Sequence, residues 1–209
     1  MGKLVLGTFV TLDGVMQAPG GPEEDRDGGF ENGGWTVPFF DEALGAQMDE
    51  LIGRSDAFLL GRKTYDIFIQ HWPHVGDEDP VAAKLNSAPK FVASRTLEDA
   101  EWRNTTVLKG ELKDEIPRLT QQYGEIQVPG SADLIQSLLR EDLVDEVTMI
   151  VFPVVLGTGK RLFGEGTIPR SMRLVDTKAF PTGVVLHRYE RVGAPEYGAV
   201  GLETEAAQA

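Results

Sequence analysis

The segment Leu60-Gly-Arg-Lys-Thr64 places two cations and a hydroxyl directly after an apolar run, in a chain otherwise rich in acids. The apolar run is typical of a buried strand, and the residues after it are typical of a helix. Ligands of open α/β sheets gather beyond the carboxyl ends of the strands, where helix N-termini offer free N–H groups to phosphate. Arg62 adds a planar fork of donors that matches phosphate oxygens. The segment therefore indicates a phosphate site, with a helix start carrying solvated cations as the alternative.

Two further segments repeat this arrangement at the ends of other predicted strands. Ser94 and Arg95 come at the end of the strand predicted over 90–94, and Gly130 and Ser131 follow the strand predicted over 125–128. Ser131 stands where a helix N-cap is expected. Each segment alone is also a common connection between a strand and a helix. Together the three strand ends match a dinucleotide with an extra phosphate: the diphosphate on helix N-termini and the 2′-phosphate between Ser94 and Arg95.

Acid–base chemistry falls to carboxylates in this sequence. Asp13 follows the first predicted strand, and Asp41 and Glu42 stand at the start of a predicted helix, where the helix dipole favours the ionised form. The alternative is a structural role: Asp13 as a turn residue, and Asp41 and Glu42 as charges at the start of a helix. The pair in His71-Trp-Pro-His74 is interrupted by proline and is more typical of a surface loop than of a zinc site, so we expect no metal.

The sequence lacks two common motifs, the phosphate-binding P-loop and the nucleophile elbow. The segment Gly157-Thr-Gly-Lys160 resembles the end of a phosphate-binding P-loop, but the position of its first glycine is Val154 and the residue after the lysine is Arg161. No G-x-S-x-G nucleophile elbow occurs.

Composition and charge restrict the partners. The 209 residues include 20 Lys and Arg against 33 Asp and Glu, a formal net charge of −13, and no cysteine. Such a surface repels nucleic acid and anionic membranes, and no apolar run reaches the roughly 20 residues that span a bilayer. We expect a cytoplasmic protein that binds a small-molecule substrate, without disulfides or thiolate zinc sites.

Strand and helix patterns alternate along most of the chain, and a hairpin follows. We expect strands over 3–10, 56–60, 90–94, 105–108, 125–128 and 146–152, helices over 38–53, 64–70, 79–87, 112–123 and 131–140, and a hairpin of 171–178 with 183–191. This order predicts a mostly parallel sheet with an antiparallel edge. The glycine-rich stretch 17–34 has no packing pattern and is expected to be a functional or disordered loop. We expect one domain over 1–192 and a flexible acidic tail over 193–209.

The set of Thr11-Leu-Asp-Gly14, Leu60-Gly-Arg-Lys-Thr-Tyr65, Pro129-Gly-Ser-Ala-Asp-Leu134 and the run 152–163 resembles the dihydrofolate reductase-like superfamily. Within it, the chain is most similar to the C-terminal reductase domain of the bifunctional riboflavin-biosynthesis deaminase-reductase, over about residues 3–191. The resemblance implies an α/β, three-layer fold with a mostly parallel, twisted sheet of about eight strands, binding of NADPH and a homodimer. The implied cofactor residues are Gly61, Arg62, Lys63, Thr64, Ser94, Arg95, Gly130, Ser131, Ala132, Asp133 and Leu134.

The resemblance implies hydride transfer to a C=N or C=O carbon of a heterocyclic or sugar-derived substrate, similar to a 5-amino-6-ribosylaminouracil phosphate, with Asp13 or Asp41 relaying the proton. The chain departs from dihydrofolate reductase at Gly130-Ser131, where that enzyme has two glycines, and Asp41 and Glu42 compete for the place of its single acid. A nucleotide-binding protein without turnover and a folate-type reductase are the alternatives. The chain lacks the zinc ligands of a deaminase domain, so a bifunctional enzyme is not expected.

Overall fold

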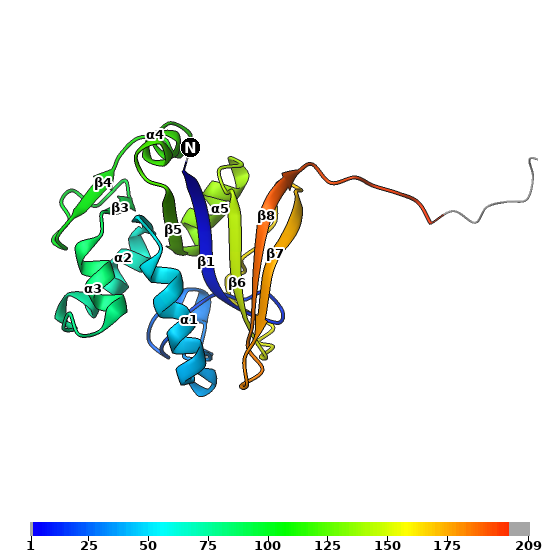
Figure 1. Cartoon of the computed structure of the whole chain (residues 1–209), viewed down its shortest axis with the longest axis horizontal. Helices are drawn as coiled ribbons and strands as arrows, with labels where there is room; N and C mark the ends of the chain where they lie inside the picture. Colours follow the sequence, from blue (N-terminus) through cyan, green and yellow to red (C-terminus); the bar gives the residue numbers. More distant parts are fainter. Residues whose placement is uncertain (1, 201–209) are drawn as a thin grey trace, which may run out of the picture.

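The computed structural model describes residues 2–200, in which helices lie on both faces of one eight-stranded sheet (Figure 1). The sheet order is β4-β3-β2-β5-β1-β6-β8-β7. The strands are β1 (Lys3–Thr11), β2 (Ala57–Gly61), β3 (Lys90–Ala93), β4 (Thr105–Leu108), β5 (Glu125–Gly130), β6 (Glu146–Phe152), β7 (Ser171–Ala179) and β8 (Val185–Gly193). The first six are parallel, and β8 pairs antiparallel with both β6 and β7. The predicted fold class is confirmed.

The helices form two layers because successive strand residues point to opposite faces of the sheet. Their bounds are α1 (Glu42–Gly53), α2 (Arg62–Phe68), α3 (Pro80–Ser87), α4 (Leu112–Gln122) and α5 (Ala132–Arg140), with 3-10 turns η1 (Asp27–Gly29), η2 (Val37–Phe39) and η3 (Trp72–His74). In β2, Ala57 and Leu59 belong to the core that α4 and α5 cover, whereas Phe58 and Leu60 pack with residues of α2 and α3. Helix α1 covers the neighbouring part of that second face, against residues of β6 and β8.

The ends of three parallel strands lie next to one another. Strand β2 is flanked by β3 and β5, with Gly61 opposite Ala93 on one side and Leu60 opposite Gly130 on the other. The chain therefore leaves all three strands at the same edge of the sheet. The predicted dinucleotide site requires these three strand ends to lie next to one another, as they do here.

Helix α1 begins later than predicted. Pro38 lies inside the 3-10 turn η2, and the backbone is extended at Asp41, whose carboxylate accepts a hydrogen bond from the Leu44 N–H and so caps α1. An aspartate N-cap satisfies an N–H group that would otherwise have no partner in the helix. The helix predicted over 38–53 therefore becomes a 3-10 turn followed by a helix from Glu42.

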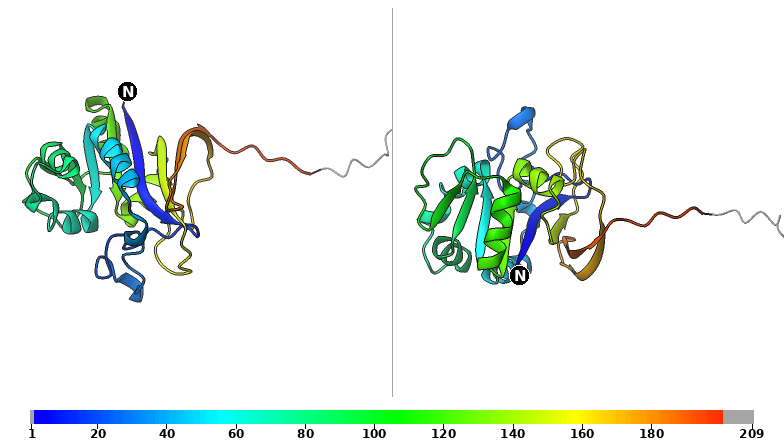
Figure 2. Two further views of the ribbon diagram at one scale, coloured as in Figure 1. Left: turned by 60° about the horizontal axis from the view of Figure 1, so that its bottom comes forward. Right: turned by 90° about the horizontal axis from the view of Figure 1, so that it is seen from above.

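The C-terminal hairpin leaves one long edge strand exposed. Residues 172–179 of β7 are exposed along their whole length, and the chain beyond β8 extends away from the body (Figure 2). Residues 194–200 have no regular secondary structure; the rest of the predicted tail, 201–209, lies outside the described residues. Within the described chain, no helix combines the length and the apolar character needed to cross a membrane.

Candidate functional site

A large cleft opens beside the ends of β2 and β5. Its volume is about 1060 Å³, slightly above the roughly 300–1,000 Å³ typical of small-molecule sites. The predicted cofactor residues that line it are Lys63, Thr64, Gly130, Ser131, Ala132 and Asp133. It is also lined by residues from β1, α1, the loop after β1 and the start of α3. The structure therefore brings two of the three predicted strand ends to one cavity.

The N-terminus of α5 faces this cleft. Ser131 is the N-cap residue of α5, as predicted, but its hydroxyl makes no capping hydrogen bond. The peptide bond between Gly130 and Ser131 is cis. Thr64 lies so close to Gly130 that a Cβ built on the glycine would come within 2.5 Å of the Thr64 hydroxyl oxygen. The two strand ends thus form one continuous surface of hydroxyl and amide groups.

The third strand end lies outside the lining of the cleft. The Ser94 hydroxyl oxygen accepts hydrogen bonds from the Thr96 and Leu97 N–H groups, which leaves its own O–H free to donate, and Arg95 is exposed. Arg62 is exposed as well and pairs with Asp66 one helical turn away, at 2.8 Å. These residues follow Ala93 and Gly61, which pair in the sheet, and therefore form an outer rim next to the cleft.

Two other predicted cofactor residues are buried in packing contacts. Gly61 is fully enclosed at the end of β2 and is the N-cap residue of α2. Leu134 is 6% exposed and belongs to the core that α5 forms with the sheet. Neither Gly61 nor Leu134 lines the cleft, so any contact of these two residues with a ligand would come from their backbone atoms.

The stretch 17–34 is a loop with one 3-10 turn, η1, and its first part, residues 17–25, lines the cleft. Buried Gln17 donates from Nε2 to the Asp25 and Asp27 carbonyls, at 3.1 and 3.0 Å, and accepts from the Lys160 N–H at 3.0 Å. The Trp35 indole donates to the Gln17 carbonyl at 2.8 Å. One buried amide therefore organises a loop whose glycines gave no packing pattern in the sequence.

A cluster of two lysines and two aspartates lies at this loop, and three of its members, Asp25, Lys63 and Lys160, line the cleft. The two Asp25 carboxylate oxygens accept from Lys63 Nζ at 2.7 Å and Lys160 Nζ at 2.8 Å. Asp27 binds the same two ammonium groups, at 2.5 and 2.7 Å. Burial opposes ionisation of Asp25, but the hydrogen bonds from Lys160 and Lys63 outweigh it and lower its pKa; the same two lysines lower the pKa of Asp27 to about 2. Lys63 was predicted to hold a phosphate, and here it binds carboxylates.

Glu24 is the partly buried acid of the cleft. Burial raises the pKa of its carboxyl, although the Gly20 and Gly21 N–H groups donate to Oε2, at 2.5 and 3.0 Å, and oppose that shift. These hydrogen bonds hold the side chain in place. A carboxyl with a raised pKa in a ligand-sized cavity is a candidate general acid.

The three predicted acids lie outside the lining of the cleft. Asp41 caps α1, and Glu42 is exposed in the first turn of that helix. Asp13 accepts from the Thr11 hydroxyl at 2.6 Å and from the Leu156 and Gly157 N–H groups at 3.2 and 2.8 Å. The Thr11 hydrogen bond is the main cause that lowers the Asp13 pKa to about 2. Asp13 thus braces a turn and Asp41 caps a helix, and the catalytic role of Asp13, Asp41 or Glu42 stays a prediction.

Asp49 is an acid that the sequence interpretation missed. It lies on α1 with Gly45, Met48 and Ile52, and all four line the cleft. Their spacing of three and four residues places them on one helical face. The signal was present in the sequence, as a carboxylate within an apolar helical stripe.

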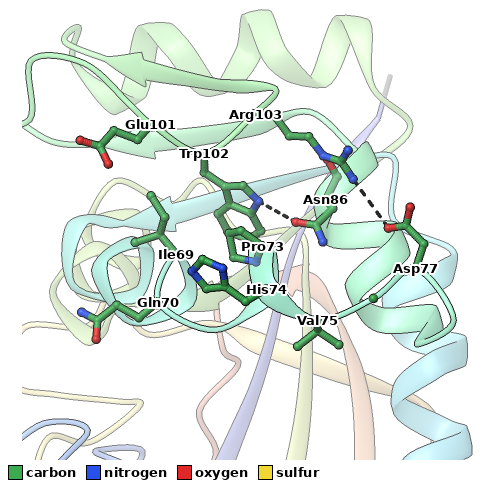
Figure 3. Close-up of a pocket in the computed structure, with 11 residues that line it drawn as sticks. Ile69, Gln70, Pro73, His74, Val75, Asp77, Asn86, Glu101, Trp102 and Arg103 are labelled. Carbon is green, nitrogen blue, oxygen red and sulfur yellow. Dashed lines mark hydrogen bonds and ion pairs between the residues drawn. The ribbon is translucent and has the colours of Figure 1, made fainter.

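A second, more open cavity of about 760 Å³ lies near η3 (Figure 3). The Trp102 indole donates to Asn86 at 2.8 Å, and Arg103 pairs with Asp77 at 3.7 Å. None of the predicted site residues lines this cavity. Residues 2–200 also contain no cluster of three or more acids and histidines placed to bind a metal.

Comparison with known proteins agrees with this architecture. The YyaP protein of Bacillus subtilis (strain 168) is 29% identical over 189 residues, which cover 88% of this chain and 92% of YyaP. The crystal structure of a riboflavin biosynthesis protein from Shewanella sp. PV-4 superposes with a TM-score of 0.65 and 24% identity, covering 91% of this chain and 99% of the other. A Thermotoga maritima protein, named as a deaminase and 5-amino-6-(5-phosphoribosylamino)uracil reductase, superposes with a TM-score of 0.59 and 14% identity, over 91% of this chain and 57% of that one.

The model of one family spans nearly the whole ordered body. It matches residues 2–186, from the start of β1 into β8. The predicted resemblance is confirmed, and the chain belongs to the RibD C-terminal domain family.

Proposed function

We propose that the protein is an NADPH-dependent reductase that reduces a C=N or C=O carbon of a heterocyclic or sugar-derived substrate. The observation that carries the proposal is the cleft of about 1060 Å³ at the ends of β2 and β5, in a chain of the RibD C-terminal domain family. Its size admits a nicotinamide ring together with a substrate of similar size. When bound, NADPH supplies the hydride, and the protein supplies binding, orientation and a proton.

The diphosphate of the cofactor would bind at the N-terminus of α5. Ser131 leaves the first amides of α5 without a side-chain cap, and no hydrogen bond of the Thr64 hydroxyl occurs within the described residues. Free N–H groups at a helix N-terminus favour phosphate oxygens. The residues present therefore fit a diphosphate that lies across Thr64, Gly130, Ser131 and Ala132. Asp133, in the same first turn, remains a prediction, as do Gly61, Lys63 and Leu134.

The 2′-phosphate would bind on the outer rim formed by Arg62, Ser94 and Arg95. Two guanidinium groups and a free hydroxyl hydrogen match the oxygens of a phosphate dianion. The pairing of Gly61 with Ala93 brings the starts of both segments to the same edge. We therefore expect NADPH to bind more tightly than NADH.

Glu24 would donate the proton. Its raised pKa keeps a larger fraction of the carboxyl protonated near neutral pH than an exposed glutamate retains. Asp13 has the opposite property, since a carboxyl with a pKa of about 2 is ionised at neutral pH. The proposal therefore assigns the proton to the cleft acid and does not rely on Asp13, Asp41 or Glu42.

Thermal unfolding with and without nicotinamide cofactors tests the proposal. We expect NADPH to raise the melting temperature and to quench tryptophan fluorescence, because Trp72 lines the cleft. NADH should give a smaller response at the same concentration. No response to either cofactor contradicts the proposal, and an equal response to both contradicts the 2′-phosphate site. Binding without any NADPH oxidation across a panel of pterins and aminouracils identifies a nucleotide-binding protein without turnover.

We further propose that two chains pair through β7. This edge strand is nine residues long and carries Leu174 and Val175 with exposures of 49 and 40%. A long, exposed apolar edge strand is a template for pairing with another chain. The double variant Leu174→Lys, Val175→Lys should sediment as a monomer. The matched control, Gln121→Lys with Gln122→Lys on the exposed end of α4, should leave the dimer intact; a monomeric wild-type chain contradicts the proposal.

A further inference from the structure

The charges that line the cleft are mostly negative. Six carboxylates take part in its lining: Glu23, Glu24, Asp25, Asp49, Asp79 and Asp133. The only cations among its described lining residues are Lys63 and Lys160. If the proposed function holds, this inventory bears directly on the substrate, because the substrate shares the cleft with the nicotinamide.

Both lysines are already neutralised inside the protein. Asp25 bridges them through its two oxygens, and Asp27 binds both through Oδ2, so each ammonium group has two carboxylate partners within 2.8 Å. The Asp25 side chain is 10% exposed, and its loop is fixed by Gln17. A lysine ammonium has three donors, and two are used here within one rigid cluster. The cluster therefore lacks the free positive charge that a substrate phosphate would need.

The other cleft carboxylates add negative charge and leave the cleft without a free cation among its described lining residues. Glu23 pairs with Arg26 on the exposed side of the loop, and Asp79 caps α3 by accepting from the Ala82 N–H. Asp49 and Glu24 have no cationic partner within the described residues. A carboxylate repels a nearby phosphate, and the repulsion is stronger beside a protein surface than in bulk water. Away from the N-terminus of α5, which the cofactor diphosphate would occupy, a substrate phosphate would therefore meet repulsion without compensation.

We infer that this cleft selects a heterocyclic substrate that carries no phosphate and is uncharged or cationic, with Asp25 and Asp27 as specificity-determining residues. Carboxylates accept hydrogen bonds from the amino and ring N–H groups of such a heterocycle. The anionic cofactor is compatible with this assignment, since its phosphates would lie on the α5 amides and the outer rim, where Arg62 and Arg95 stand. The substrate would thus differ from the phosphoribosylamino compound in the name of the Thermotoga protein.

A matched pair of ligands tests the inference. The probes are 5-amino-6-ribosylaminouracil and its 5′-phosphate, which differ only in the phosphate. Dissociation constants are measured by calorimetry with saturating NADP⁺, which would occupy the α5 amides and has no hydride to transfer. We expect the wild-type chain to bind the dephosphorylated compound roughly tenfold more tightly, a difference of about 1.4 kcal/mol.

Two variants show whether Asp25 and Asp27 cause the preference. In Asp25→Asn with Asp27→Asn, both lysines are released, and the phosphorylated compound should gain roughly tenfold in affinity while the other changes little. The control Asp77→Asn with Glu78→Gln removes the same charge at exposed positions outside the cleft and should leave the preference unchanged. Lys160→Gln keeps both aspartates but removes one positive charge, so the preference for the dephosphorylated compound should increase. This second variant tests the inference even if the aspartate variant folds poorly.

Three results would overturn the inference. They are a phosphorylated probe that binds as tightly as the other or more tightly, a preference that neither cleft variant shifts, and a cleft that binds neither probe. Failure of the proposed function is seen separately, as the absence of any effect of NADPH on the melting temperature.

Discussion

The outer rim and the cleft, two adjacent regions at the end of the same parallel strands, differ in charge. On the rim beyond β2 and β3, Arg95 is exposed and Arg62 pairs with one half-exposed carboxylate, Asp66, whereas each lysine of the cleft beside β2 and β5 is bound to two aspartates. The rim resembles an anion site built from arginine and hydroxyl groups. The cleft offers carboxylates, a loop anchored by buried Gln17 and a helix face with apolar residues. The difference teaches that the sequence motifs supply the rim and the amide and hydroxyl groups of the cleft, whereas a loop with no motif supplies several of the cleft carboxylates.

This contrast divides the proposed reaction between the two regions. The rim would discriminate between cofactors through one phosphate, and the cleft would select the substrate and hold the proton. An acidic chain with a net charge of −13 can bind an anionic cofactor if the anion stays near arginine and backbone amides. The predictions below act on one region at a time.

Removing the cleft acid should have the largest effect. Glu24→Gln keeps the shape and the acceptor for the Gly20 and Gly21 N–H groups but removes the proton, so kcat should fall roughly 10²- to 10⁴-fold with little change in cofactor affinity. In the wild type, the rate should decline as pH rises through the raised pKa of Glu24, because the donor is then deprotonated. The measurement is steady-state NADPH oxidation across pH with a turned-over substrate.

Asp49→Asn is the matched control for the cleft acid. Asp49 lines the same cavity from α1 and has no backbone N–H groups that hold it in place among the described residues. We expect a smaller loss of kcat and a preserved pH profile. If Asp49→Asn abolishes the pH dependence of the rate and Glu24→Gln does not, the proton donor is Asp49 and not Glu24.

Changes on the rim should act on cofactor choice alone. In Arg62→Ala with Arg95→Ala, the affinity for NADPH should fall by roughly tenfold or more while that for NADH stays constant, since hydrogen bonds to a charged group contribute roughly 1.5–3 kcal/mol. Fluorescence titration with both cofactors measures the ratio. Lys113→Ala with Arg118→Ala, exposed cations on α4, is the matched control and should leave both affinities unchanged. An equal loss for NADH and NADPH would place the arginines on the diphosphate instead.

The sequence predicted the fold well because its signals are local and repeated. Apolar strands such as Glu146–Phe152 and the amphipathic face of Leu134, Ile135 and Leu138 needed only periodicity to be recognised. Strand ends were also predictable, since parallel strands with crossover helices leave the sheet at the same edge. Both signals hold for segments of about ten residues and do not depend on distant partners.

The sequence predicted the strand-end residues that line the cleft but not its acidic loop, because the contacts of that loop form only in three dimensions. Lys63 follows β2, Lys160 lies in the loop after β6, and both converge on Asp25 in the loop after β1. The separations of 38 and 135 residues leave no periodic trace. Asp41 and Asp13 drew attention because they flank regular elements, which is also why they cap and brace those elements. Position next to a strand or helix thus identified structural acids more readily than cleft acids.

The smallest expected effect concerns Asp13 and separates bracing from catalysis. Asp13→Asn turns one acceptor into a donor that faces the Thr11 hydroxyl or the Gly157 N–H, so the free energy of unfolding should fall by about 1–2 kcal/mol while kcat stays within roughly threefold. The folded-state pKa of about 2 lies below the ordinary 3.8, so the wild-type carboxylate stabilises the fold fully above about pH 4 and loses that contribution as pH falls toward 2. Chemical denaturation at pH 6 and pH 3 should therefore show a smaller difference between the two pH values in Asp13→Asn than in the wild type. A variant with wild-type stability and a kcat reduced a hundredfold would instead return Asp13 to the catalytic role that its position after the first strand predicted.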